Sequence, residues 1–500
     1  MGIEKQQVER AGTAGGRRPS EPTSPLKYAL AAAPADTARR ILLSALKAWL
    51  TGYATAAVPS IVGIILKCFR KGFNKFDLRD TVVKIVRVLL EKSPRARMPW
   101  FFLALIGGFK ALDRVADMLV RYMYARNAVK SGKEVTIDDD KHDLENGGLV
   151  KDVTSAKTTT VPPAIKIINP SFIAAAISSG LSLLIIPKAK RADFAIVTLV
   201  RALDSFASFQ KTWITDGLKK RKVPLSLVGN ADSAIFILAC ARIMFCWFYT
   251  QEALPRDYTK WISKMSRLDV RPLEAVRLLS RGEMVYGRDT GHANLLGDYA
   301  VSLGLPFASG DPANGQIPCT VVHGGIEGCI RHLYHVWWFG FWDALRIYIP
   351  VHLLPALIFH RHRFTHPTKA AETIWRIALG AVRSATFLAT FIDFVWLPIC
   401  AVRNITNDDS YLGPTLGAML SGTSIFIERK SRRREMMLYV VPKAIESVWW
   451  SLTKYGPGWK VPGAEVPLFG LGMGYLLSAY GHHPKALRPA VRGVLGFFLV

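Results

Sequence analysis

Residues 174–206 read AAAISSGLSLLIIPKAKRADFAIVTLVRALDSF, and residues 416–448 read LGAMLSGTSIFIERKSRRREMMLYVVPKAIESV. Aligned without a gap at an offset of 242, the two stretches share nine identical residues in 33 pairs, where chance gives about two. Each stretch joins an apolar segment to a second segment through a basic turn. This self-similarity predicts an internal duplication of the chain.

The similarity extends towards the N-terminus of each stretch, with gaps. Phe102-Leu103-Ala104 resembles Phe387-Leu388-Ala389, and Leu46–Trp49 resembles Leu345–Tyr348. Each half then holds four hydrophobic segments, near 42–66, 98–120, 170–187 and 193–213 in the first half, and near 342–359, 378–402, 411–428 and 436–454 in the second. Segments of about 17 to 25 residues suit a bilayer, where a helix satisfies its own backbone. We therefore predict an all-α, multi-pass transmembrane protein with two similar four-helix halves.

The composition agrees with a membrane protein. Half of the 500 residues are hydrophobic, and the formal net charge is +27. The basic residues gather between apolar segments, at 67–75, 188–191, 219–222 and 429–434, rather than on one face. Loops on one side of a membrane carry such clusters, and anionic lipids attract them. The expected partners are the lipid bilayer, anionic lipids, and further copies of the chain or other membrane proteins, and nucleic acid is not among them.

The hydrophobic segments divide the chain into five expected parts. Residues 1–38 are rich in Gly, Pro and Arg and predict a disordered tail. The first membrane module covers 39–215 and contains a polar insertion at 121–168, and a connecting region at 216–318 includes an apolar helix at 234–249. The Cys/His cluster and the second module cover 319–455, and a membrane-associated segment covers 456–500.

Small residues recur on one face of the third segment of each half. They are Ala176, Ser179 and Gly180 in the first half, and Ala418, Ser421 and Gly422 in the second. Small faces let helix backbones approach closely in lipid, so these positions predict helix packing. Repetition of the pattern in both halves favours a specific interface.

Charged residues lie inside segments expected to be apolar. They are Arg201 with Asp204, Lys443 with Glu446, and Asp393. Charges at membrane depth usually face protein or water. Two interpretations remain open: a polar groove for a translocating solute, or helices that lie near the lipid headgroups.

Cys319, His323 and Cys329 form a cluster just before the second half. Two thiolates and an imidazole are zinc ligands, but a tetrahedral structural site needs a fourth ligand. The alternatives are a redox pair and plain structural cysteines. Zinc is thus the one candidate cofactor, and the chain carries no acyltransfer, nucleophile-elbow or phosphate-loop motif. We expect no catalytic residues and no enzyme activity.

Pro318-Cys319, His323 and Cys329, followed by Leu345–Pro350 (LRIYIP), resemble the cysteine-rich domain of the transmembrane protein 135 family, fungal branch. The resemblance covers about 225–450 and includes Trp261–Met265 and Gly282–Gly287. It implies kinship with the superfamily of mitochondrial inner-membrane translocase subunits and peroxisomal membrane proteins. The implied role is lipid or metabolite handling, or homeostasis of peroxisomes and mitochondria, in one of those membranes. The rival functions are a protein-translocation or channel component and a membrane-bound metalloenzyme.

Overall fold

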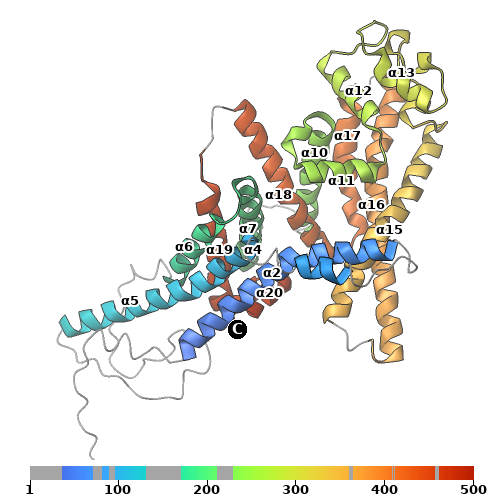
Figure 1. Cartoon of the computed structure of the whole chain (residues 1–500). Coiled ribbons are helices and arrows are strands. Elements are labelled where there is room, and N and C mark those ends of the chain that lie inside the picture. Colours follow the sequence, from blue (N-terminus) through green and yellow to red (C-terminus); the bar gives the residue numbers. More distant parts are fainter. Residues whose placement is uncertain are drawn as a thin grey trace, which may run out of the picture. The chain divides into compact units, whose positions relative to one another are not determined.

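The computed structural model describes residues 36–70, 81–88, 96–130, 170–210, 229–359, 364–407, 409, 411–456 and 461–499. The described chain is 85% helical and contains no strand, which confirms the predicted all-α class. The helices form two compact units (Figure 1). Unit 1 comprises the chain up to Arg191 together with Val466–Val500, and unit 2 comprises Ala192–Glu465.

Unit 1 is built from α2 (Asp36–Arg70), α4 (Arg97–Phe102), the π-helical turn η2 (Leu103–Gly107), α5 (Gly108–Lys130), α6 (Pro170–Leu183), α19 (Glu465–His482) and α20 (Pro489–Leu499). α2 and α4 pack backbone to backbone, since a Cβ on Gly52 would lie 2.6 Å from the carbonyl oxygen of Met98. α6 packs against α5 and η2, and its Ser178 hydroxyl donates to the Ala104 carbonyl of η2 at 3.0 Å.

Unit 2 contains most of α7 (Lys188–Phe209) and the long helices α10 (Ala231–Tyr249), α15 (Cys329–Phe359), α16 (Pro367–Thr406) and α18 (Lys430–Tyr455). α17 (Leu412–Ser421) continues into the 3-10 turn η8 (Gly422–Ile427). Shorter helices follow α10: η4 (Gln251–Ala253), α11 (Arg256–Ser266), α12 (Val270–Arg281), α13 (Ala293–Ser302), η5 (Phe307–Gly310), η6 (Pro312–Asn314) and α14 (Cys319–Val322). The core of unit 2 centres on α10, which packs against α17 and α18.

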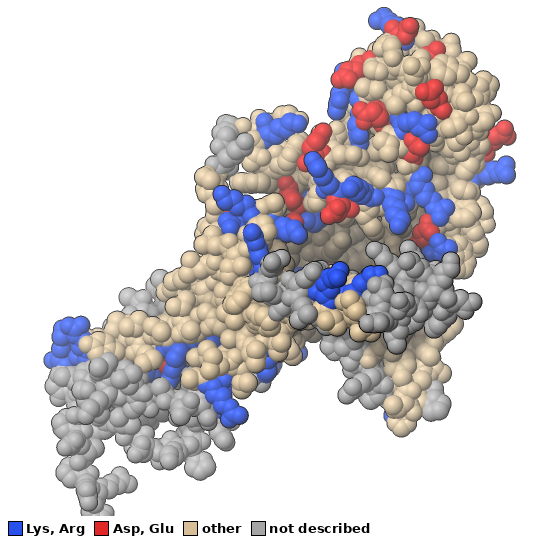
Figure 2. All heavy atoms as spheres, viewed as in Figure 1, with Lys and Arg blue, Asp and Glu red and all other residues tan. Residues whose placement is uncertain are grey.

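Three described helices are long and apolar enough to cross a membrane. They are Ala38–Val58, Ala231–Tyr249 and Thr368–Thr406, and Pro170–Leu183 and Leu412–Ile427 are shorter apolar helices. These spans support a membrane protein, and the larger predicted number of eight stays a prediction. Figure 2 shows that, on the face drawn, charged side chains of unit 2 gather over α11–α13 and across its middle, and uncharged side chains cover long tracts elsewhere.

The apolar segments expected from the sequence are helical where the structure describes them. Two details differ from the expectation. Residues 121–130 of the expected polar insertion continue α5 as helix, and the expected connecting region contains, besides its apolar helix, the short helices α11–α13. The tail up to residue 35 and residues 131–168 of the insertion lie outside the described residues.

Candidate functional site

A cavity of about 570 Å³ lies inside unit 2. Its lining is mostly apolar and comes from the helices α10 to α18. On α10, the lining residues follow helical spacing and are all buried: Phe236, Cys240, Ile243, Met244 and Trp247. A volume of this size and chemistry is typical of sites for small hydrophobic ligands.

The short helices α11 and α12 form one wall of the cavity. α11 places Tyr258 and Ile262 on the lining, and α12 places Leu273 and Ala275 there. Both helices are strongly amphipathic, so their apolar faces turn to the cavity and their charged faces turn away. Burial raises the pKa of Tyr258 far above its usual range, which keeps its hydroxyl neutral.

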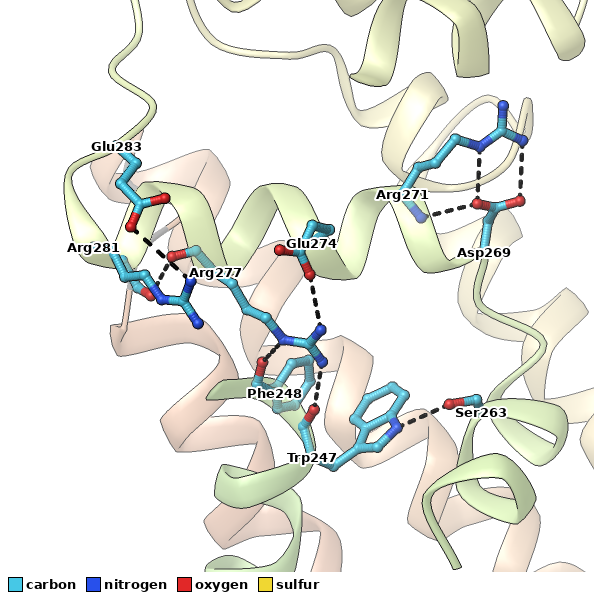
Figure 3. Close-up of polar contacts among 10 residues, drawn as sticks. Trp247, Phe248, Ser263, Asp269, Arg271, Glu274, Arg277, Arg281 and Glu283 are labelled. Atoms are coloured by element: carbon cyan, nitrogen blue, oxygen red, sulfur yellow. Dashed lines mark hydrogen bonds and ion pairs between the residues drawn. The ribbon is translucent and has the colours of Figure 1, made fainter. Parts of the chain in front are cut away.

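Arg277 fastens this wall to the end of α10 (Figure 3). Its guanidinium group donates to the carbonyl oxygens of Phe248 at 2.7 Å and Trp247 at 3.1 Å, and pairs with Glu274 at 2.9 Å. The last carbonyls of a helix lack partners within the helix, and a cation also favours the negative end of its dipole. Arg277 therefore caps α10 from the neighbouring helix α12.

Two further contacts in Figure 3 orient the same wall. The Trp247 indole donates to the Ser263 hydroxyl at 3.1 Å, which connects α10 to α11. Asp269 is the N-cap of α12, since its carboxylate accepts from the Arg271 backbone N–H at 2.9 Å and from the Arg271 guanidinium at 3.0 and 3.1 Å. These hydrogen bonds to Arg271 hold the pKa of the Asp269 carboxyl below its usual value.

The cavity has polar groups at its margins. Arg403 and Asp409 form a buried ion pair at 2.9 Å, and the Tyr286 hydroxyl donates to Asp409 at 2.6 Å. Arg403 also donates to the Ile317 carbonyl, so the loop before α14 is fixed to the end of α16. Arg432 contributes the polar edge on α18. In apolar binding sites, a small number of polar groups fixes the orientation of a ligand that has one polar end.

A buried polar network surrounds Arg432. Its guanidinium donates to the Ser384 hydroxyl at 2.7 Å and pairs with Glu428 at 3.6 Å, and it also contacts the His352 ring. Ser384 in turn donates to Glu428. The network joins α15, α16 and α18 and satisfies a carboxylate that is almost fully buried.

The predicted small-residue faces lie at close helix contacts. In unit 1, α6 packs on α19, where a Cβ on Gly470 would lie 2.6 Å from the Ala176 carbonyl oxygen. In unit 2, a Cβ on Gly422 would lie 2.8 Å from Cα of Ile237 on α10. Ser179, Ser421 and Ala418 are buried. All six residues therefore lie in helices that pack at short range.

The predicted charged residues form ion pairs between α7 and α18. Arg201 pairs with Glu435 at 2.8 Å, and Asp204 pairs with Arg434 at 2.6 Å. Lys443 pairs with Asp193 at 2.7 Å and with Glu446 at 3.3 Å. Asp393 lies apart from them on α16, and its Oδ1 is buried with no hydrogen-bond partner among the described residues. That these charged groups line a groove for a translocating solute stays a prediction.

The structure brings the three predicted metal ligands together. The ligand atoms of Cys319, His323 and Cys329 all lie within 4.8 Å of one another, and this donor set can hold a metal ion. Burial and the charge of Arg403 lower the pKa of His323 to about 4, so its imidazole is neutral at neutral pH. A third sulfur, that of Cys400 on α16, lies 3.3 Å from His323 Nε2.

Sequence reasoning missed Cys400 and the residues that build the cavity wall. Cys400 sits in an apolar helix, where a cysteine reads as an ordinary small hydrophobe. The wall formed by α11 could have been predicted from the helical spacing of the apolar residues Trp261, Ile262 and Met265. Comparison with known protein families, curated proteins and solved structures finds no match to this chain.

Proposed function

We propose that this chain is a multi-pass protein of an internal organelle membrane that binds a lipid or a similarly apolar metabolite in the cavity of unit 2. The observation that carries the proposal is the apolar cavity of about 570 Å³ with Arg403, Asp409 and Arg432 at its margins. An acyl chain or ring system suits the apolar walls, and a polar head suits the charged edge. The proposed role is ligand handling without catalysis.

An internal duplication is the second part of the proposal, and matched local structure supports it. α7 and α18 begin at Lys188 and Lys430, 242 residues apart, and the equivalent segments before them, α6 and α17, are both helical. Ser182 donates to the Ser179 carbonyl at 2.7 Å, as Ser424 does to that of Ser421 at 2.8 Å. Equivalent residues therefore make equivalent hydrogen bonds.

The ion pairs between α7 and α18 have the pattern of an interface between two like elements. At the offset of 242, Asp193 corresponds to Glu435 and Arg201 to Lys443. The pairs Asp193–Lys443 and Glu435–Arg201 are then the same contact made twice, in opposite senses. A two-fold relation between copies produces such reciprocal contacts.

The helices that follow each repeat are exchanged. α10 follows α7 in the chain but packs on α17, and α19 follows α18 but packs on α6. Exchange of equivalent elements between copies is the arrangement found in domain swapping. It supports a duplicated protein whose repeats each extend to five helices, one more than the sequence pattern suggested.

The proposed location is a peroxisomal or mitochondrial membrane. Its support is the resemblance of residues 225–450 to the transmembrane protein 135 family, together with the basic clusters between apolar segments. Cofractionation of a tagged chain with either organelle, in a form that resists carbonate extraction, tests this part separately from ligand binding.

The cavity is tested by filling it. The full chain is purified in detergent and labelled with a photoactivatable fatty acid, and the labelled peptides are identified by mass spectrometry. Cys240→Phe places a ring in the cavity, so we expect several-fold less labelling on α10, α11 and α12. Leu238→Phe, on the exposed face of α10, is the matched control and keeps wild-type labelling.

Equal labelling of both variants, or labelling confined to the outer faces of the helices, would contradict the proposal. Thermal unfolding of each variant shows whether the added ring has only disturbed folding. Should Cys240→Phe unfold, lipids released from the wild-type protein and identified by mass spectrometry provide the second measurement, and a preparation free of bound lipid counts against the proposal.

A further inference from the structure

The Cys/His cluster has four potential ligands, one more than the spacing in the sequence indicates. Cys319 is the first residue of α14, His323 directly follows this helix, and Cys329 is the first residue of α15. Cys400 comes from α16, a helix far along the chain. Its Sγ lies 3.3 Å from His323 Nε2, and Cys329 lies near its thiol.

We propose that Cys319, His323, Cys329 and Cys400 form a structural zinc site. With Zn–S bonds of about 2.3 Å and Zn–N bonds of about 2.0 Å, tetrahedral geometry separates neighbouring ligand atoms by roughly 3.5–3.8 Å. Cys400 Sγ lies 3.3 Å from His323 Nε2, and the ligand atoms of Cys319, His323 and Cys329 lie within 4.8 Å of one another, so these separations are compatible with tetrahedral geometry. Four protein ligands leave no open position, as in structural rather than catalytic zinc sites.

The surroundings of the four ligands suit a metal better than a disulfide. Arg403 lies near Cys319, and the side-chain amide of Asn404 donates to Cys329 Sγ at 3.5 Å. Three thiolates around Zn²⁺ leave one net negative charge, and the Arg403 guanidinium, which is also paired with Asp409, lies on the same side of the cluster. Hydrogen bonds from such outer groups orient ligands and stabilise thiolates.

The ring of His323 is held in place before any metal binds. It stacks on the His332 ring at 4.1 Å between centroids and 6° between planes, and His332 packs edge-on against Trp396. The loop between His323 and Cys329 turns through Gly324 and Gly328, whose φ values of 67° and 80° strain any residue with a Cβ. A ligand set fixed in this way loses little entropy on binding.

The site connects the cavity wall to a candidate membrane span. Ile317, Val321 and Val322 line the cavity next to the ligands, and Cys400 lies within the span Thr368–Thr406. A metal bonded to both segments holds α14 against α16. Zinc therefore stabilises the packing of α14 on α16 beside the cavity, and this role does not depend on the ligand proposed above.

Metal content tests the site directly. The full-length protein, purified in detergent without chelator and supplied with zinc, is expected to hold one zinc per chain by elemental mass spectrometry. Cys400→Ser is expected to lower zinc retention at least tenfold after dialysis. The control Cys246→Ser changes a buried cysteine of α10 outside the cluster and keeps the wild-type content.

Three results would overturn the proposal: wild-type protein without zinc, unchanged zinc retention in Cys400→Ser, or a disulfide between Cys319 and Cys329 found by alkylation under non-reducing conditions. If Cys400→Ser does not fold, cobalt replaces zinc in the wild-type protein, and its absorption spectrum reports the number of thiolate ligands. Three thiolates support the site, and two or fewer exclude Cys400. Zinc content is independent of lipid labelling, so the two proposals fail separately.

Discussion

Arg191 and Arg433 make the same two hydrogen bonds at positions 242 residues apart in the chain. Arg191 donates to the carbonyl oxygens of Ile186 at 2.8 Å and Leu184 at 2.7 Å, and Arg433 donates to those of Glu428 and Phe426, both at 2.9 Å. Each guanidinium thereby satisfies carbonyls that the end of an apolar helix leaves without partners. The planar fork of arginine reaches two carbonyls at once, which a lysine ammonium does not do at this spacing.

The first prediction concerns the two hydrogen bonds from Arg433 to backbone carbonyl oxygens. Arg433→Lys loses at least one of the two charge-assisted hydrogen bonds, so the free energy of unfolding falls by about 1–2 kcal/mol. Thermal unfolding of the detergent-purified chain measures the change. Arg429→Lys, at an exposed position of the same turn, serves as the control and leaves the melting temperature unchanged. An equal shift in both variants would show that the carbonyl contacts are unimportant.

A second prediction concerns the pair Arg201–Glu435 between α7 and α18. Arg201→Glu and Glu435→Arg each place like charges together and destabilise the chain, and the double variant restores the attraction. Because both side chains are partly exposed, we expect a coupling free energy of about 0.5–1 kcal/mol. A double-mutant cycle of thermal unfolding at low salt measures it. If the losses of stability in the two single variants simply add in the double variant, the two side chains do not interact directly.

The cap of α10 provides a third prediction. Arg277→Ala removes the donor to the Trp247 and Phe248 carbonyls and lowers stability by about 2 kcal/mol. We expect faster hydrogen exchange in α11 and α12, since this contact fastens them to α10. Arg281→Ala is the matched control on the same helix, because Arg281 is half exposed and forms a long ion pair with Glu283, at 4.0 Å (Figure 3). Comparable exchange in both variants would contradict the role given to Arg277.

A fourth prediction is the pH dependence at Asp269. Its hydrogen bonds to Arg271 lower the pKa in the folded state below the usual value of 3.8, so the unfolded chain binds the proton more readily. The stabilisation is complete well above pH 3.8 and is lost as the pH falls through that value towards the folded-state pKa. The difference in melting temperature between wild type and Asp269→Asn should shrink over this range. A difference that is constant with pH would exclude the charge as its cause.

Removal of zinc is the fifth prediction. A chelator should lower the melting temperature and increase hydrogen exchange in 317–329, because those residues lose their bond to α16. Exchange in α2 and α6 should stay unchanged, since unit 1 contains none of the four ligands. Added zinc should reverse the effect. A melting temperature that is the same with and without chelator would argue against a structural metal.

The amino-acid sequence by itself determined where the helices lie and which faces pack. The runs of apolar residues at 231–249 and 367–406 can only satisfy their backbone as helix, and the small faces at Gly180 and Gly422 require a close neighbour. These features depend on local periodicity and size, which a linear chain displays. The same holds for the cluster of Cys319, His323 and Cys329, whose members lie within one short segment.

Only the tertiary structure decided which helix meets which. α6 packs on α19 and α17 packs on α10, although hundreds of residues separate α6 from its neighbour in the chain, and no periodicity records such a pairing. The cavity takes its lining from the helices α10 to α18, and Cys400 comes near His323 only because α16 passes beside it. Contacts between distant segments depend on the summed packing of whole helices, so they emerge when the chain folds and are not written in any local stretch.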